Sequence, residues 1–192
     1  MTQIRSGFIS IVGRPNAGKS TLLNSLVGQK ISIVSPKPQT TRDNILGIFN
    51  ENGVQMIFVD TPGAIKPKNA LGGYMARSID RAVSDVDCIL LVIDGHDGID
   101  EKELALVENY GKKGKPLVVA VTKTDITQPE KLMPELAKLN CMENVAEVFA
   151  VSAKRGRNVE TLRESLKKYL TDDKRYFEED DVTDKPRSYI VC

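Results

Sequence analysis

The residues GRPNAGKST have the spacing of a loop that binds phosphate. They follow the apolar run GFISIV and precede a helical pattern, so backbone N–H groups and the start of the helix can surround a phosphate. Lys19 can place its charge beside the β- and γ-phosphates, and the Ser20 hydroxyl can bind Mg²⁺. The alternative is a chance glycine-rich turn, which this strand-to-helix context disfavours. The residues assigned to the loop are Gly13, Arg14, Pro15, Asn16, Ala17, Gly18, Lys19, Ser20 and Thr21.

A second segment, VDTPG, ends another apolar run with an aspartate. Asp60 can hold Mg²⁺ directly or through water, and Gly63 lets a backbone N–H approach the γ-phosphate because no side chain intervenes. Alone, this sequence could equally form an ordinary turn. Its place downstream of the phosphate loop favours nucleotide binding. The residues assigned to it are Asp60, Thr61, Pro62, Gly63 and Ala64.

The polar segment SPKPQTTRDN, residues 35–44, could complete the metal site. Thr40 or Thr41 could bind Mg²⁺ when a γ-phosphate is present, which would order the segment. Of the two we favour Thr41. Without the phosphate loop nearby, a plain surface connection would be the better interpretation.

The motif TKTD follows the apolar run PLVVAV, and its aspartate has the chemistry to recognise guanine. Asp125 can accept hydrogen bonds from the guanine N1–H and 2-amino group, whereas adenine would leave this carboxylate unpaired at a cost of roughly a few kcal/mol. Lys123 can lay its alkyl chain along the purine face. The residues assigned to base binding, with those of the next motif, are Thr122, Lys123, Thr124, Asp125, Ser152, Ala153 and Lys154.

The motif SAK follows the last apolar run, and there the Ala153 N–H can reach the guanine O6. By itself SAK favours an ordinary loop. It is the last of an ordered series of motifs, each expected at the carboxyl end of a strand, and that order favours base binding.

Short β-branched runs alternate with longer segments of helical period, which is typical of an α/β domain with a largely parallel sheet. The predicted strands lie near residues 7–12, 44–50, 54–59, 87–93, 116–121 and 146–151, with helices on both faces. The ENG between the second and third strands is a hairpin signal, so one of the six strands should be antiparallel. Asp100 and Glu103 have the pattern of a helix N-cap and its reciprocal partner.

The apolar periodicity ends near Leu170, and the acidic, proline-containing stretch after it is typical of a linker. We therefore predict one domain over residues 1–171 and a linker over residues 172–192.

Composition excludes several classes of protein. The net charge of +1 with 28% charged residues gives no indication of a polyanion-binding body. Three widely spaced cysteines without CxxC spacing favour a reducing compartment, and neither a signal peptide nor a membrane-spanning run is evident. We expect a cytoplasmic protein. His96 is interpreted as a solvated turn residue, and Asp94, Asp97 and Asp100 miss the spacing of a calcium loop.

The motifs GRPNAGKST, PQTTRDNILGI, VDTPG, TKTD and VSAK occur in the order of the guanine-nucleotide motifs of translation-factor-related GTPases, and the chain resembles the Era family over residues 7–188. The stretches LLNSLVGQKISIVSPKPQTTR and FEEDDVTD add to this resemblance. It implies a P-loop NTPase G domain that binds GTP and GDP with Mg²⁺ and hydrolyses GTP. Era proteins continue into a KH-type domain that contacts 16S rRNA of the small ribosomal subunit, so the resemblance implies a nucleotide switch in 16S rRNA maturation, with the KH domain expected beyond this chain.

Carried over by position, the resemblance implies catalytic roles for Lys19, Thr41, Gly63 and Asn16, and metal-binding roles for Ser20, Thr41 and Asp60. Asn16 resembles the asparagine that helps to seat K⁺ in related potassium-dependent GTPases. Thr122 stands where the family usually has asparagine, whose amide bonds the guanine N7 and ties its loop to the phosphate loop; a hydroxyl should replace one of these bonds with less reach. Ala64 and Ile65 follow DTPG where Ras-like proteins place a water-orienting glutamine, so hydrolysis should be slow.

Other functions remain open at this point. The chain could be a nucleotide-gated docking module with incidental hydrolysis, or a Der-like or tRNA-modification GTPase. An ATPase or kinase is disfavoured by Asp125. The expected partners are guanine nucleotide, 16S rRNA and the small subunit, together with peripheral association at the inner face of the cell membrane; no DNA partner is expected.

Overall fold

The computed structural model of the chain describes residues 4–31, 45–60 and 86–183. Its elements are β1 (Arg5–Gly13), α1 (Lys19–Val27), β2 (Ile45–Glu51), β3 (Val54–Asp60), β4 (Cys88–Asp94), α3 (Glu101–Gly111), β5 (Leu117–Thr122), α4 (Pro129–Asn140), β6 (Glu147–Ala150), α5 (Val159–Leu166) and the 3₁₀ turn η1 (Lys167–Tyr169). Within these ranges, each helix falls short of the length and apolarity that crossing a bilayer would take.

The strands form one six-stranded sheet in the order β2-β3-β1-β4-β5-β6. The β1–β3, β1–β4, β4–β5 and β5–β6 pairs are parallel, and β2 is antiparallel to β3. The hairpin turn between β2 and β3 has Asn52 at φ 49° and Gly53 at φ 79°. Two successive left-handed residues match the right-handed twist of a hairpin, which is why asparagine and glycine are favoured there. The predicted mostly parallel sheet with one antiparallel strand is confirmed.

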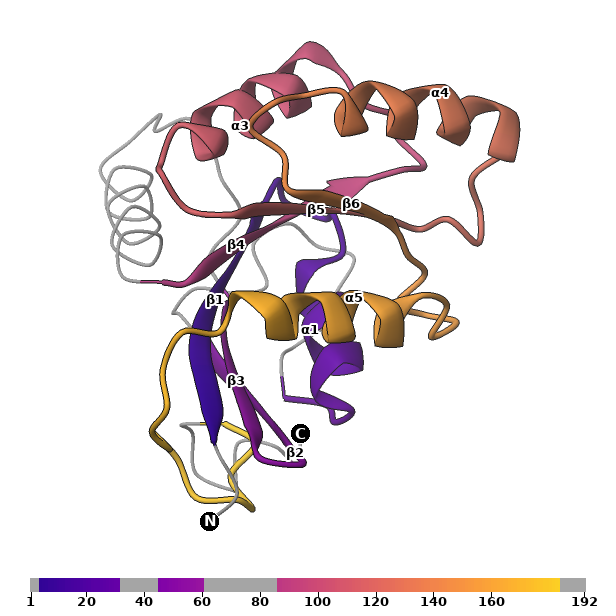
Figure 1. The fold of residues 1–192 in the computed structure, drawn as a ribbon. Coiled ribbons are helices and arrows are strands. Elements are labelled where there is room, and N and C mark those ends of the chain that lie inside the picture. Colours follow the sequence, from indigo (N-terminus) through magenta and orange to yellow (C-terminus); the bar gives the residue numbers. More distant parts are fainter. Residues whose placement is uncertain (1–3, 32–44, 61–85, 184–192) are drawn as a thin grey trace, which may run out of the picture.

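Helices cover both faces of the sheet (Figure 1), with α1 and α5 on one side and α3 and α4 on the other. Side chains of the central strand β4 alternate between the two cores. Leu90 and Val92 belong to the core beneath α1 and α5, and Ile89 and Leu91 belong to the core beneath α3 and α4. Every residue of β4 is buried, as expected for a parallel strand covered on both faces.

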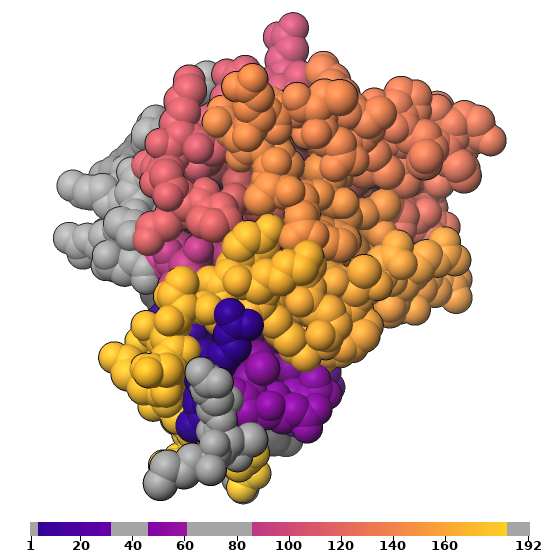
Figure 2. Space-filling model, viewed as in Figure 1, coloured from indigo at the N-terminus to yellow at the C-terminus, as the bar shows by residue number. Residues whose placement is uncertain are grey.

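The residues after η1 lie against the antiparallel end of the sheet. Figure 2 shows the yellow C-terminal residues beside the indigo and purple residues of β1–β3. The buried Gln55 side chain donates to Phe177 O at 3.0 Å and accepts from Phe177 N at 3.1 Å, and Ile48 N donates to Val182 O at 2.9 Å. We call residues 172–183 the C-terminal segment. Residues 184–192 lie outside the described ranges, and the domain division at residue 171 stays a prediction.

Candidate functional site

The predicted motif residues gather at the carboxyl end of the sheet. β1 ends at Gly13, β3 at Asp60, β4 at Asp94 and β5 at Thr122, and Ser152 follows β6. Parallel strands end at the same edge, which is where open α/β sheets bind ligands. The topology therefore brings motifs that are far apart in the sequence into one site.

The phosphate loop begins with a glycine that no other residue could replace. Gly13 has φ 147°, and a Cβ added there would lie 2.3 Å from the carbonyl oxygen of Val92 on the neighbouring strand. Gly18, at φ 93°, closes the loop just before α1 begins at Lys19. The loop therefore leads directly into the N-terminus of α1. The backbone N–H groups and the helix dipole at this position favour binding of an anion.

Lys19 is buried, with its amine directed at the loop. Its Nζ donates to Arg14 O at 2.8 Å and to Gly13 O at 3.2 Å. Burial lowers the pKa of the Lys19 amine, and the carboxylates of Asp60 and Glu103 oppose this shift. The loop carbonyls hold the amine at the mouth of the phosphate loop, and the two carboxylates favour its charged form.

The proposed metal ligands Ser20 and Asp60 lie next to each other. Ser20 Oγ donates to Asp60 Oδ2 at 3.2 Å, and Asp60 is fully buried at the end of β3. A hydroxyl and a carboxylate oxygen side by side fit the hard-oxygen preference of Mg²⁺, which usually keeps several waters and takes few protein ligands. The remaining predicted residues of this region, Thr40, Thr41, Thr61, Pro62, Gly63, Ala64 and Ile65, lie outside the described ranges.

A pocket of about 200 Å³ lies between the two base-binding motifs and the phosphate loop. The residues that line it are Gly18, Thr21, Thr122, Lys123, Asp125, Ile126, Ala153 and Lys154. Ser152 Oγ donates to Asp125 Oδ1 at 2.6 Å, and this hydrogen bond holds the pKa of the Asp125 carboxyl below its ordinary value. An ionised carboxylate in this pocket is the acceptor that guanine requires.

Two further contacts position the base loop. Thr124 N donates to Val151 O at 3.4 Å, and the buried Thr122 Oγ1 lies 2.6 Å from Ala17 O and 3.1 Å from Ile93 O. The threonine hydroxyl therefore makes the connection to the phosphate loop that the family makes with an asparagine amide.

A sequence model of the family described as "50S ribosome-binding GTPase" matches residues 8–123. The chain belongs to this family. The curated GTPase Era of Clostridium kluyveri is 42% identical over 98% of the chain, and that of Staphylococcus haemolyticus is 38% identical over 100%. The chain spans 64% of the length of both relatives.

Solved structures agree with this family assignment. A crystal structure of Era in complex with MgGDPNP and nucleotides 1506–1542 of 16S ribosomal RNA matches 95% of this chain and 63% of its own, with TM-score 0.88 and 37% identity. An Aquifex aeolicus Era variant bound to GDP·AlF4⁻ matches equally, at TM-score 0.88 and 36% identity. The resemblance to Era and the predicted P-loop GTPase fold are confirmed.

Asp94, considered from sequence only as part of a calcium loop, takes part in this site. Its buried Oδ2 forms an ion pair with Lys123 Nζ, and its Oδ1 accepts from His96 N at 3.0 Å. His96 itself is exposed in the turn, as predicted. The signal was present, because Asp94 ends an apolar run in the same way as Asp60 does. It orients the lysine expected to cover the purine.

The start of α3 differs from its prediction in one respect. Asp100 is the N-cap, and its Oδ1 accepts from Lys102 N and Glu103 N. The reciprocal bond from Glu103 to the cap is absent among the described residues, so that part of the prediction is wrong. Glu103 Oε1 instead accepts from Arg14 Nη1 of the phosphate loop at 3.4 Å.

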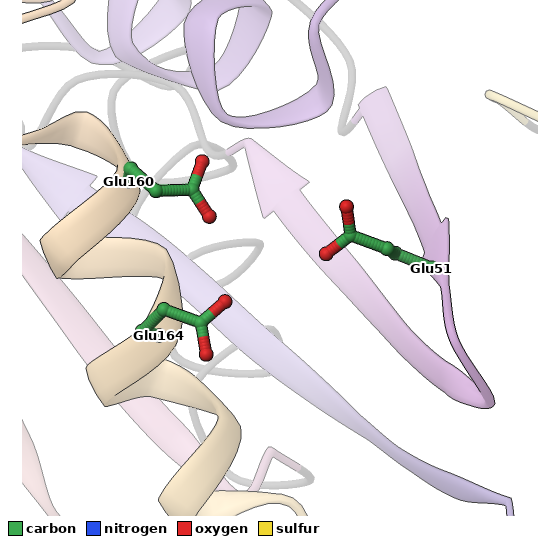
Figure 3. Close-up of side chains that lie close together, drawn as sticks. All are labelled: Glu51, Glu160 and Glu164. Carbon is green, nitrogen blue, oxygen red and sulfur yellow. The ribbon is translucent and has the colours of Figure 1, made fainter.

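Three carboxylates outside the nucleotide site also come together: Glu51, Glu160 and Glu164 (Figure 3). All three are exposed, and each lies beside a cation. Lys167 Nζ is 3.4 Å from Glu51 and 2.5 Å from Glu164, and Arg163 pairs with Glu160. These ion pairs account for the cluster without a metal.

Proposed function

We propose that this chain forms the G domain of an Era-type GTPase, which binds GTP and GDP with Mg²⁺ and hydrolyses GTP to GDP and phosphate. The ionised Asp125 carboxylate carries the proposal, because it lies in a pocket that continues to Gly18 and Thr21 of the phosphate loop. A base with two adjacent donors, such as guanine, complements that carboxylate, whereas adenine does not. Family membership and the Era structures with bound guanine nucleotides support the same conclusion.

In GTP hydrolysis the protein would act by positioning the reactants and by neutralising phosphate charge. Bound Mg²⁺ would supply positive charge at the β- and γ-phosphates. Ser20 and Asp60 would hold it, with Thr41 as the third protein ligand, and Lys19 would add its own charge. Gly63 would offer its N–H to the γ-phosphate, and Asn16 would help to seat K⁺. Because no side chain is assigned to activate water, slow turnover is expected.

Nucleotide competition tests the proposal directly. GTP should displace a fluorescent GDP analogue from this chain at much lower concentration than ATP or XTP. In Asp125→Asn the preference should move from GTP to XTP, because xanthine offers an acceptor where guanine has its amino group. Asp97→Asn, an exposed aspartate outside the pocket, is the matched control. Tighter binding of ATP than of GTP by the unaltered chain would contradict the proposal.

We further propose that the nucleotide switch acts in 16S rRNA maturation in the cytoplasm, with peripheral membrane association at the inner face. The Era structure that holds a 16S rRNA fragment supports the rRNA role. In this proposal a KH domain following the G domain contacts the RNA. GTP turnover should rise with that fragment in a protein that includes the KH domain and stay slow in this chain. Unchanged turnover in both would favour a docking module with incidental hydrolysis.

A further inference from the structure

The guanidinium of Arg14 lies between two carboxylates of helix α3. Its Nη1 is 3.2 Å from Asp100 Oδ2 and 3.4 Å from Glu103 Oε1. Arg14 belongs to the phosphate loop, and its own carbonyl accepts the hydrogen bond from Lys19 at 2.8 Å. The phosphate loop is therefore attached, through one side chain, to the start of α3.

The two carboxylates have different surroundings. The Asp100 side chain is 49% exposed and caps α3, whereas the Glu103 side chain is 3% exposed. In the part of the chain that the structure describes, Glu103 Oε2 has no hydrogen-bond partner, and Arg14 is the cation in contact with this carboxylate. A buried carboxylate depends strongly on its cation, because removing the cation leaves a charge with neither water nor a partner.

We infer that Glu103 is a positioning residue for the nucleotide site, holding Arg14 and thereby the backbone of the phosphate loop. The inference rests on the proposed function, since it concerns the same site. The Arg14 carbonyl is one of the two that hold Lys19, so a displaced Arg14 changes where the Lys19 amine lies. With Arg14 directed to α3, Lys19 is the loop cation that would face bound phosphates.

The test is a double-mutant cycle read out by the dissociation constant for GDP. Glu103→Gln and Arg14→Ala should each weaken GDP binding about tenfold, and the double variant should bind no more weakly than Arg14→Ala alone. Glu101→Gln is the matched control, because Glu101 is an exposed carboxylate in the same first turn of α3. The ratio of GDP to XDP affinity should stay unchanged in every variant, since the base pocket is untouched.

Two results would overturn the inference but not the proposed function. In the first, Glu103→Gln binds GDP as tightly as Glu101→Gln does. In the second, the fold-increase in the GDP dissociation constant of the double variant equals the product of the fold-increases of the two single variants. Failure of the unaltered chain to bind GDP would overturn the proposed function as well. The double variant leaves no buried charge unpaired, since Asp100 is half-exposed, so it remains the test if a single variant does not fold. It must then bind GDP about tenfold more weakly than the unaltered chain.

Discussion

Thr122 Oγ1 lies 2.6 Å from the carbonyl oxygen of Ala17, joining the base loop to the phosphate loop across 105 residues of sequence. Both residues are almost fully buried. A Cβ placed on Gly18 would lie 3.4 Å from the same hydroxyl oxygen, so the two loops are packed as well as hydrogen-bonded. The base loop and the phosphate loop are therefore held together through one side chain.

Removing the hydroxyl should weaken nucleotide binding. Thr122→Val keeps the shape of the side chain but leaves the buried Ala17 carbonyl without this donor, at a cost of about 1–3 kcal/mol. Because part of this cost also falls on the protein without nucleotide, we expect the GDP dissociation constant to rise about threefold to tenfold, measured by titration calorimetry. Thr161→Val, at an exposed threonine on α5, is the control. Unchanged GDP affinity in Thr122→Val would show that the two loops hold their positions independently.

Restoring the usual asparagine should not harm binding. In Thr122→Asn the amide N–H can keep the bond to the Ala17 carbonyl, and the longer side chain gains reach toward the guanine N7. GTP and GDP should bind as tightly as in the unaltered chain or more tightly, in the same calorimetric titration. Clear weakening would mean that the packing around Gly18 requires threonine.

Asp94→Asn should weaken purine binding, because it removes the charge that orients Lys123. Lys123 is partly exposed, so the effect is modest, and we expect a rise of about threefold in the GDP dissociation constant. Asp97→Asn is the control, since Asp97 is an exposed aspartate of the same turn. Equal GDP affinities in the two variants would show that Asp94 does not contribute to nucleotide binding.

The pH dependence of stability should reveal the burial of Glu103. Burial raises the pKa of its carboxyl, with Asp100 and Asp94 adding to the shift and Arg14 opposing it. When the pKa of a carboxyl is higher in the folded state than in the unfolded state, its protonation stabilises the fold fully below the unfolded-state pKa, which is near 4.3 for glutamate. This stabilisation is lost as pH rises through the folded-state pKa.

Glu103→Gln has no proton to lose, so its free energy of unfolding relative to the unaltered chain should increase as pH rises from about 4 through the raised folded-state pKa of Glu103. Urea unfolding without nucleotide measures this difference. Glu101→Gln should show a flat difference over the same range. A difference that decreases with pH would mean that the ion pair with Arg14 outweighs the burial.

Turnover should depend on potassium if Asn16 helps to seat that ion. Release of phosphate from GTP should be faster in KCl than in NaCl at equal ionic strength, because a dehydrated K⁺ would add charge beside the transferring phosphoryl group. Asn16→Ala should remove most of the difference. Equal rates in the two salts would contradict the role of Asn16.

The sheet was predictable from sequence because its signals are local. Buried strands read as apolar runs, and the Asn52–Gly53 turn identifies the one antiparallel pair. The contacts that organise the site are not local. The pair Arg14–Glu103 is separated by 89 positions and the pair Thr122–Ala17 by 105, and neither follows from residue type until the topology places α3 and β5 beside the phosphate loop. The sequence of the C-terminal segment is typical of a linker because its contacts are also distant in sequence. Its partners Gln55 and Asn50 belong to the β2–β3 hairpin.

The C-terminal segment also changes what the sheet offers to other molecules. β2 is an edge strand, and Ile48 N and Gly47 on that edge are paired with Val182 and Thr183 of the same chain. An edge strand with unpaired N–H and C=O groups is a template for joining a second chain. The opposite edge, β6, has four residues, too few for extensive pairing. By occupying part of the longer edge, the segment protects the protein against strand-to-strand aggregation.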